Sequence, residues 1–555
     1  MNLTGSSSKQ SLFSGPFFWV ILLVFVAINI SGLFDPLIGN ASKYAQVSRE
    51  ILDNQNWINL TIAHEPYDQK PPLLFWLGAF FYSLFGVSFI SFKIPVLLIS
   101  AIGIYSTYRL AKLLYNSEVG LLAAFLWGTS LGYLHFHNDI HTDTVLADFV
   151  MLAVWQFTAF FRFKKWHQFL LGSIGVGLAM LSKGPIGLAI PVAALGLQLL
   201  VHRKFREIFH LRWLLAIPIV GIIILPALIG LFNQFGLEGL KFYFWTNNVG
   251  RVTGSYRSSS SDMFFYFHNL ILMVLPWFMF VYPGLIMEIR KYILKIFRRE
   301  KWEESDEVIN IGGFGFMFII LTIASQKNPH YMMAILPFAM IISAKWMLEF
   351  FNQGKFKNLR KGISVVNYIY PVLMVALILL VMFWIYPESR IWFWIIFALA
   401  LSGLIIFWLK YHGLKKQMAI LLMAQTLFLL SFNISIFPSI LGNYSTFKAC
   451  QIFNEEAGED EVLHSYRVRL WSLFYYSKSY GEWITEGDKL REVLAQDGVW
   501  IFTDQVGLDV LDKWKVNYTL KGDFNHRSVT GQTPAFLNPK TRAQHFQKNF
   551  LVKIK

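Results

Sequence analysis

The stretch PPLLFWLGAFFYSLFG, residues 71–86, decides how this chain is threaded through a membrane. It belongs to a series of apolar runs between Phe17 and Ile440, most of them about 17 to 25 residues long and able to cross a hydrocarbon core of roughly 30 Å. Unlike the others, it opens with two prolines and is rich in Phe, Trp and Tyr, which is typical of helices in the headgroup layer. We therefore expect a polytopic α-helical membrane protein in which residues 71–86 form an interfacial helix at the outer face.

The distribution of basic residues supports this assignment. If residues 71–86 crossed the membrane, every later basic loop would lie on the opposite side from Lys9. Without that crossing, 24 Lys and Arg fall in cytosolic loops and span ends and ten fall outside, which is the positive-inside pattern. The thirteen predicted spans are then 17–34, 91–113, 118–136, 145–161, 168–182, 185–201, 213–234, 263–287, 308–324, 330–348, 364–386, 391–409 and 417–440. The alternative is that residues 71–86 do cross and that another apolar run has been miscounted.

The composition excludes a soluble globule. Of the 555 residues, 55% are hydrophobic and 15% are charged, against about 25% charged residues in soluble domains. The net charge of +15 comes almost entirely from short loops of the membrane part, such as RFKKWH at 162–167, so we expect no nucleic-acid partner. The single cysteine, Cys450, cannot form a disulfide within the chain. Residues 1–16 precede an apolar run that is too long for a signal peptide, so we expect a cytosolic N-terminus.

An odd number of spans places the tail outside the cytosol. In this tail the runs VWIFTD (499–504) and WKVNYTL (514–520) predict strands, and DKLREVLAQ (488–496) predicts a helix. We therefore expect three regions: a cytosolic N-terminus (1–16), a transmembrane domain (17–444) with a long outer loop (35–90), and a small extracytoplasmic α/β domain (445–555).

Polar residues of the membrane part gather in the predicted outer loops. In the second of these loops, His137, Asp139, His141 and Asp143 recur at every second position. On a helix the two histidines would lie four residues apart on one face, and so would the two aspartates. His137 and His141 are therefore weak candidates for a metal site. A hydrated loop with capping carboxylates explains the same pattern. Asp148, in the first turn of the next span, is costly there unless it faces a hydrated cavity, so we expect it to line the site.

Six short motifs follow one another in the outer loops. They are Tyr-Ala-x-x-x-Arg-Glu at 44–50, Lys-Pro-Pro-Leu-x-x-Trp at 70–76, Asp143, Ser-Lys-Gly at 182–184, Asn248 to Arg251 before Pro276 and Trp277, and Tyr331 followed by Leu336 and Pro337. In this order and spacing, the chain resembles the bacterial lipid-linked-sugar glycosyltransferases of the GT-C type, specifically the aminoarabinose transferase and protein O-mannosyltransferase-like family. The resemblance covers residues 17–350 strongly and the remainder in architecture only.

The resemblance implies a GT-C fold and a glycosyltransferase of the bacterial inner membrane. Such an enzyme moves a sugar from a polyprenyl-phosphate donor to a lipid, glycan or protein acceptor at the outer face, as in lipid A modification. The leaving phosphate gains negative charge and needs cations nearby. Donor phosphate or lipid binding is therefore assigned to Lys70, Lys183, Arg251, Lys327, Tyr331 and Tyr44. The resemblance demands no cofactor, and a divalent metal stays an open alternative.

The chain departs from the family pattern at two positions. Members usually carry an Asp just before the Tyr-Ala helix, where this chain has Asn40, and the acidic residue that often precedes Lys-Pro-Pro is here Gln69. Because asparagine cannot act as a base, we expect Asp143, with help from Asp139 or Asp68, to supply the catalytic carboxylate. The alternative is a catalytically degenerate relative that serves as a lipid-binding or scaffolding partner. A secondary transporter is disfavoured, because the ionisable groups gather at one face and no inverted repeat is evident.

Overall fold

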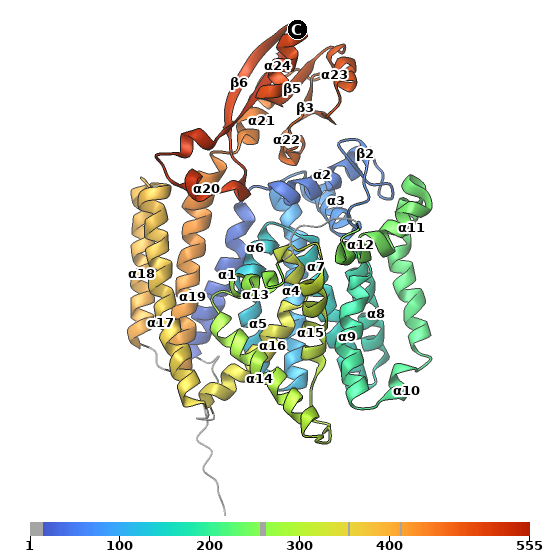
Figure 1. The fold of residues 1–555 in the computed structure, drawn as a ribbon, viewed down its shortest axis with the longest axis vertical. Coiled ribbons are helices and arrows are strands. Elements are labelled where there is room, and N and C mark those ends of the chain that lie inside the picture. Colours follow the sequence, from blue (N-terminus) through green and yellow to red (C-terminus); the bar gives the residue numbers. More distant parts are fainter. Residues whose placement is uncertain (1–14, 256–261, 353–355, 411–412) are drawn as a thin grey trace, which may run out of the picture.

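The computed structural model describes residues 15–255, 262–352, 356–410 and 413–555 (Figure 1). Residues 1–14 of the predicted cytosolic segment lie outside this range, as do residues 256–261 of a Ser-rich outer loop. Long helices form a bundle, and a small sheet domain built from the C-terminal residues sits at one end of it. This architecture confirms the predicted fold class, a multi-pass helical membrane protein with a C-terminal α/β domain.

The apolar runs form the helices of the bundle. These are α1 (Gly15–Ser31), α4 (Phe89–Leu114), α5 (Ser117–Gly128), α6 (Leu131–Asn138), α7 (Thr142–Phe163), α8 (Trp166–Lys183), α9 (Ile186–Val201), α11 (Trp213–Lys241), α13 (Phe265–Met273), α14 (Phe278–Phe297), α15 (Ile309–Ile323), α16 (Leu336–Asn352), α17 (Lys357–Leu380), α18 (Ile391–Lys410), α19 (Gly413–Ser431) and α20 (Phe437–Leu441). Within the described ranges, six helices are long and apolar enough to cross a membrane, or up to eight when each of two bent pairs counts as one span. The number of thirteen spans therefore stays a prediction.

The segment that decides the threading forms the short helix α3 (Leu73–Phe85). Its 13 residues give a length of about 20 Å, less than the roughly 30 Å of a hydrocarbon core. It packs against α2 (Gly39–Asp53) and α4, at the end of the bundle that faces the C-terminal domain (Figure 1). Its length and position are those expected of an interfacial helix.

Two predicted spans are broken. The predicted span 263–287 is wrong as a single helix, because α13 ends at Met273 and α14 begins at Phe278. Pro276 lies in the gap, where it lacks the backbone N–H that a continuous helix needs. The predicted span 118–136 consists of α5 and α6, which are bent by 53° relative to each other.

The C-terminal residues form a five-stranded sheet in the order β4-β3-β5-β7-β6. Its elements are α21 (Ser445–Glu456), β3 (Val462–Tyr466), α22 (Trp471–Tyr476), β4 (Tyr480–Ile484), α23 (Gly487–Leu494), β5 (Val499–Asp504), α24 (Gln505–Lys513), β6 (Tyr518–His526), α25 (Pro534–Leu537) and β7 (Gln547–Ile554). Strand β3 pairs in parallel with β4 and β5, and β7 runs antiparallel between β5 and β6. The predicted strand 499–504 and the predicted helix within 488–496 are confirmed. The strand predicted at 514–520 is wrong in its first half, because Trp514 caps α24 with its N–H bonded to the carbonyl of Val510.

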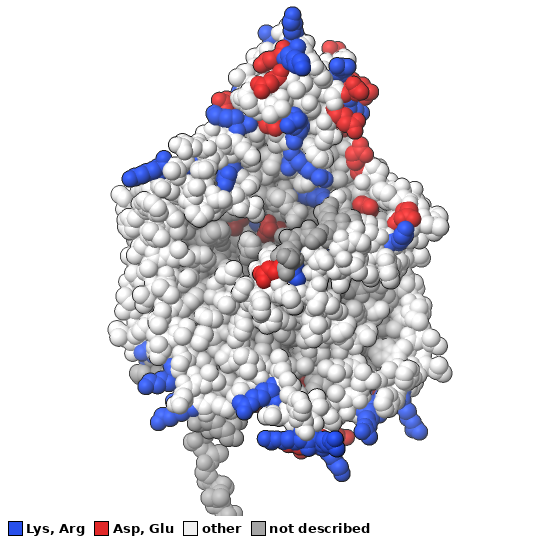
Figure 2. Space-filling model, viewed as in Figure 1, with Lys and Arg blue, Asp and Glu red and all other residues white. Residues whose placement is uncertain are grey.

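Arg49 of α2 joins the bundle to the C-terminal domain. Its guanidinium donates hydrogen bonds to the carbonyls of Ser477 at 2.9 Å and Lys478 at 3.0 Å, and it lies 4.8 Å from the ring centre of Tyr480. Lys and Arg gather at the end of the bundle that lies opposite this domain, whereas the domain itself carries both signs of charge (Figure 2). The contact holds the C-terminal domain over the end of the bundle where α2 and α3 lie.

Candidate active site

Two cationic side chains meet at Tyr331, which lies in the short 3-10 helix η3 (Pro329–Met332). Arg251, in α12 (Val249–Thr253), donates a hydrogen bond from Nη1 to the Tyr331 hydroxyl at 2.7 Å. Lys183, the last residue of α8, places its Nζ 4.2 Å from the centre of the Tyr331 ring, within the range of a cation–π contact. Tyr331 therefore holds side chains from two distant parts of the chain next to each other.

Lys70 completes what we call the cation cluster, namely Lys70, Lys183 and Arg251. It lies in the loop before α3, partly buried. Burial, followed by the positive charge of Lys183, lowers the pKa of Lys70 to about 7, while Asp143 opposes the shift. Among the residues that the structure describes, no acceptor lies within hydrogen-bond distance of the Lys70 ammonium group. The cluster therefore has a cation available for an anionic ligand.

Lys183 also forms an ion pair with Asp143, which is only 1% exposed. The local sequence explains their positions. Gly184 adopts a φ of +82°, a left-handed conformation that favours glycine, and it ends α8 directly after Lys183. Asp143 is the second residue of α7, which packs against α8. An anion at a helix N-terminus and a cation at a helix C-terminus are each stabilised by the helix dipole, so both backbones support the pair.

A cavity of about 730 Å³ lies between the bundle and the C-terminal domain. Its polar wall is formed by Asp35, Asn40, His135, Asn138, Asp139, His141 and His330. Its apolar wall includes Leu272 and Met273 near the end of α13, Phe428, Leu429, Phe432 and Phe437, and its roof includes Tyr444, Leu470 and Val529. Figure 2 shows the molecule hollowed below the C-terminal domain, with acidic side chains at the base of the hollow. The cavity can therefore accommodate a ligand that is polar at one side and apolar at the other.

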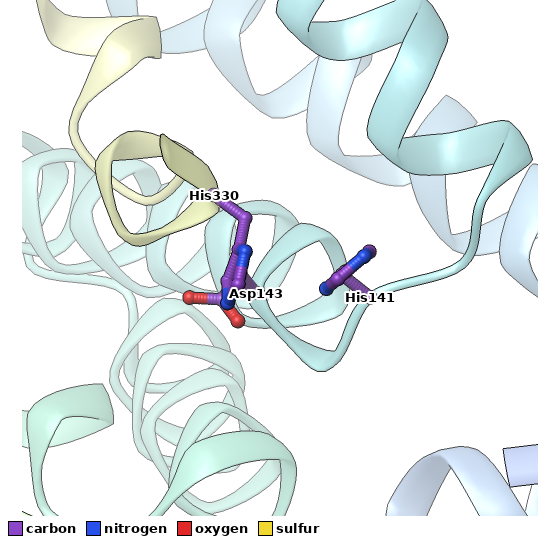
Figure 3. Close-up of side chains that lie close together, drawn as sticks. All are labelled: His141, Asp143 and His330. Atoms are coloured by element: carbon purple, nitrogen blue, oxygen red, sulfur yellow. The ribbon is translucent and has the colours of Figure 1, made fainter. Parts of the chain in front are cut away.

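His141, Asp143 and His330 lie together at the polar wall (Figure 3). One potential ligand atom from each residue lies within 4.8 Å of the other two. His141 immediately precedes α7, and His330 reaches the same point from η3. Their ring centres are 4.5 Å apart. Asp143 therefore contacts the cation cluster through Lys183 and adjoins the cavity through the two histidines.

Asp139 and Asn40, two of the predicted catalytic positions, both line the cavity. The side chain of Asp139 is 32% exposed, and its Oδ2 lies 2.9 Å from Nε2 of His141. Asn40 is the second residue of α2 and is exposed. Of the two carboxylates predicted to act in catalysis, Asp139 is therefore the one that a molecule in the cavity can reach, because Asp143 is buried.

The predicted pairing of His137 with His141 is wrong. The helix α6 ends at Asn138, so the two histidines do not share a helix face. His137 instead lies 3.3 Å from the buried carboxylate of Asp148 through Nε2 and 2.9 Å from the carbonyl of Tyr133 through Nδ1. Asp148 is not among the residues that line the cavity, which corrects the expectation that it lines the site. A pattern of every second residue cannot reveal that the chain turns between His137 and His141.

Lys327 and Tyr44 are the two remaining residues that are predicted to bind the donor. The Nζ of Lys327 donates to the carbonyls of Thr322 at 2.5 Å and Ala324 at 2.9 Å, which satisfies acceptors at the end of α15. Tyr44 is buried on α2, with its ring centre 5.5 Å from that of Phe75. The Tyr44 hydroxyl interacts electrostatically with Asp143, Tyr331 and Arg251, so Tyr44 lies beside the cation cluster. The prediction that Lys327 and Tyr44 bind the donor phosphate stays a prediction.

Two buried charged residues of α2 support the site, although no role is predicted for either, and Glu50 is the last residue of the motif at 44–50. Lys43 donates from Nζ to Oε1 of Gln69 at 2.5 Å, directly before Lys70. Glu50 accepts hydrogen bonds from the hydroxyl of Thr61 and from the backbone N–H of Ala63, both at 2.6 Å, and thereby anchors the loop that leads to Lys70. Their spacing of seven residues, two helical turns, places them on one face of α2 and could have identified them.

Removing only one charge of the Asp143–Lys183 pair should destabilise the protein more than removing both charges. Lys183→Met leaves a buried carboxylate without its partner, and we expect a loss of about 3 to 5 kcal/mol of unfolding free energy. The double variant Asp143→Asn/Lys183→Met removes both charges and should regain part of that loss. Thermal unfolding of the detergent-purified protein measures the effect.

The control is Lys241→Met, which breaks an exposed pair with Glu238 that is worth about 0 to 1 kcal/mol. Unfolding of Lys183→Met at the temperature of the parent, or a double variant no more stable than Lys183→Met, would contradict the role of this ion pair.

The chain is similar to proteins of one family. Residues 69–229 match the family described as dolichyl-phosphate-mannose-protein mannosyltransferase. An undecaprenyl phosphate-α-4-amino-4-deoxy-L-arabinose arabinosyl transferase of Pseudomonas fluorescens is 24% identical over 61% of this chain and 58% of its own length. One from Proteus mirabilis is 24% identical over 64% of this chain and 63% of its own length. The match thus spans less than two thirds of either relative.

The fold match is more extensive. The crystal structure of ArnT from Cupriavidus metallidurans bound to undecaprenyl phosphate matches with a TM-score of 0.72 and 15% sequence identity, over 97% of this chain and 98% of that chain. The same enzyme in the apo state matches equally well. The whole chain therefore shares the fold of this structure, and its sequence is similar to the mannosyltransferase family over residues 69–229.

Proposed function

We propose that the protein is a glycosyltransferase that moves a sugar from a polyprenyl-phosphate donor to an acceptor at the outer face of the bacterial inner membrane. The observation that carries this proposal is Lys70, a partly buried ammonium group near other cations that has no acceptor among the described residues. An anionic ligand stabilises the charged form of such a group. The relatives named as undecaprenyl-phosphate aminoarabinose transferases support a lipid-linked sugar phosphate as that anion.

In this proposal the cation cluster holds the donor phosphate. The bond between the anomeric carbon of the sugar and the phosphate oxygen breaks during transfer, and the leaving phosphate gains negative charge. Lys70, Lys183 and Arg251 stabilise that charge in a site that is already organised, because Tyr331 holds two of them in place. Their contribution is therefore larger in the transition state than in the bound donor.

The acceptor is proposed to enter through the cavity. Its hydroxyl group attacks the anomeric carbon and gives up a proton, for which Asp139 is the accessible carboxylate. Asp143 acts as the second carboxylate by orienting Lys183. The apolar wall and roof of the cavity favour a lipid-linked acceptor over a soluble glycan or a protein.

One observation favours the second candidate function, a degenerate relative that binds lipid without transferring sugar. Asn40 occupies the cavity wall where the family usually carries an Asp, and it is accessible there. An inactive parent, tested over a panel of polyprenyl-phosphate sugars, together with gain of transfer in Asn40→Asp would favour this candidate. Release of polyprenyl phosphate by the purified parent would exclude it.

Lys70 should dominate the affinity for the donor and its dependence on pH. Lys70→Ala removes charge-assisted hydrogen bonds, so we expect donor binding to weaken by about 1.5 to 3 kcal/mol. Because the pKa of Lys70 without ligand is about 7, binding must restore a proton to this group at higher pH. The affinity of the parent should therefore fall as the pH rises from about 7.5 to 9.5, a range in which a phosphate group keeps a constant charge.

The matched control is Lys70→Arg, whose guanidinium stays charged throughout this range, so its affinity should not change with pH. Calorimetric titration with a polyprenyl phosphate measures both effects. Parent-like binding by Lys70→Ala, or an affinity of the parent that is flat with pH, would exclude Lys70 from the phosphate site.

Asp139 should be required for turnover and not for donor binding. A general base typically contributes a factor of about 10² to 10⁴ to the rate, and Asp139→Asn should lose turnover by that factor with the affinity for the donor unchanged. Asp53→Asn, at the exposed end of α2, is the control and should keep the rate of the parent. Release of labelled polyprenyl phosphate measures the rate, and full turnover by Asp139→Asn would rule out its role as the base.

We also propose that the C-terminal domain is extracytoplasmic and the N-terminus cytosolic. Lys and Arg gather at the end of the bundle opposite this domain (Figure 2), and basic loops are retained in the cytosol. A reporter that is active only in the cytosol should be silent when fused after Lys555 and active when fused before Met1. The reverse pattern would invert the topology and place the proposed site on the wrong side.

A further inference from the structure

We propose that His141, Asp143 and His330 bind a divalent cation of the zinc class at the wall of the cavity. This site shares Asp139 and Asp143 with the proposed sugar transfer, but it needs no donor to form. Two imidazoles and one carboxylate are a ligand set that Zn²⁺ and related ions use. Mg²⁺ prefers an octahedral shell of oxygen ligands, which two histidines do not supply.

The three side chains are close enough to converge on one ion. Their potential ligand atoms lie within 4.8 Å of one another, whereas the ligands of a tetrahedral ion with bonds of 2.0 to 2.1 Å are about 3.3 Å apart. Closing the difference requires a shift of about 1 Å or less per side chain, since the ligand spacing changes at both ends. His141 and Asp143 are close in sequence at the start of α7, and His330 approaches from a separate element (Figure 3). Small side-chain rotations are therefore sufficient.

The surroundings of His141 support a role as ligand. Its Nε2 lies 2.9 Å from Oδ2 of Asp139. When this nitrogen carries the proton of the hydrogen bond, Nδ1 keeps its lone pair for an ion. A carboxylate that orients a metal-binding imidazole in this way is a regular feature of metal sites. Asp139 therefore belongs to the site as a positioning residue.

The site is open on one side. His141 and His330 both line the 730 Å³ cavity, so a three-ligand ion would face the cavity with a free coordination position for water or a polar group of a ligand. Lys183 already occupies one carboxylate oxygen of Asp143, and the second oxygen remains for the ion. The positive charges of Lys183 and Lys70 disfavour a bound cation. The two imidazole ligands are neutral, so they do not add to this positive charge.

The test is a direct titration with metal. The full-length protein, purified in detergent without a polyhistidine tag and stripped with EDTA, is titrated with Co²⁺ while its visible absorption is recorded, and bound Zn²⁺ is counted by elemental analysis. We expect one ion per chain and the absorption bands of Co²⁺ bound to imidazole. Asp139→Asn should weaken the affinity by the factor of about 10 to 100 that loss of an orienting partner costs. His330→Gln should weaken it at least as much.

The matched control is His135→Gln, which changes a histidine of the same cavity wall outside the cluster and should bind metal as the parent does. Thermal unfolding shows whether each variant is folded, and a misfolded His330→Gln is replaced by His141→Gln. A parent that binds no Co²⁺ or Zn²⁺, or folded variants of His330 and His141 that bind as the parent does, would overturn the proposal. Because no donor is present, either result is independent of whether the protein transfers sugar.

Discussion

The buried ion pair between Asp143 and Lys183 is the interaction on which the rest of the site depends. A carboxylate that is 1% exposed cannot remain charged without a partner, since its loss of hydration costs several kcal/mol. The pair therefore requires the start of α7 and the end of α8 to lie side by side. Lys183 then meets Tyr331, which in turn holds Arg251. One pair thus brings together segments that are far apart in the sequence.

Asp143 also separates two halves of the site that differ in chemistry. On one side, the cation cluster offers positive charge, and Lys70 is its available member. On the other side, the cavity combines a wall of histidine and carboxylate groups with an apolar wall and a roof from the C-terminal domain. In the proposed function the first half holds the donor phosphate and the second half receives the acceptor. The junction between them, next to His141 and His330, is where a metal ion would lie.

Particular residues show how far sequence reasoning reached. The Ser-Lys-Gly and Tyr331 motifs identified Lys183 and Tyr331, and the structure places both beside Asp143. The motif around Lys327 predicts a role in binding phosphate, and the structure shows that its ammonium group donates to carbonyls at the end of its own helix. His137 was paired with His141 by spacing, although a turn after Asn138 sends them in different directions. Motifs locate residues on elements, and they do not determine where a long or rotatable side chain ends.

The sequence by itself determined the helical membrane architecture and the position of the α/β domain at the C-terminal end, and it predicts the interfacial character of α3. These follow from hydropathy, charge and periodicity, which are properties of a segment and its immediate neighbours and need no partner elsewhere in the chain. Only the tertiary structure decided that His330 joins His141 and Asp143, that Lys70 lacks an acceptor among the described residues, and that Asp148 turns to His137. Each of these depends on distances between segments that α-helical packing brings together, and such distances are set by the shapes of whole helices rather than by any local pattern.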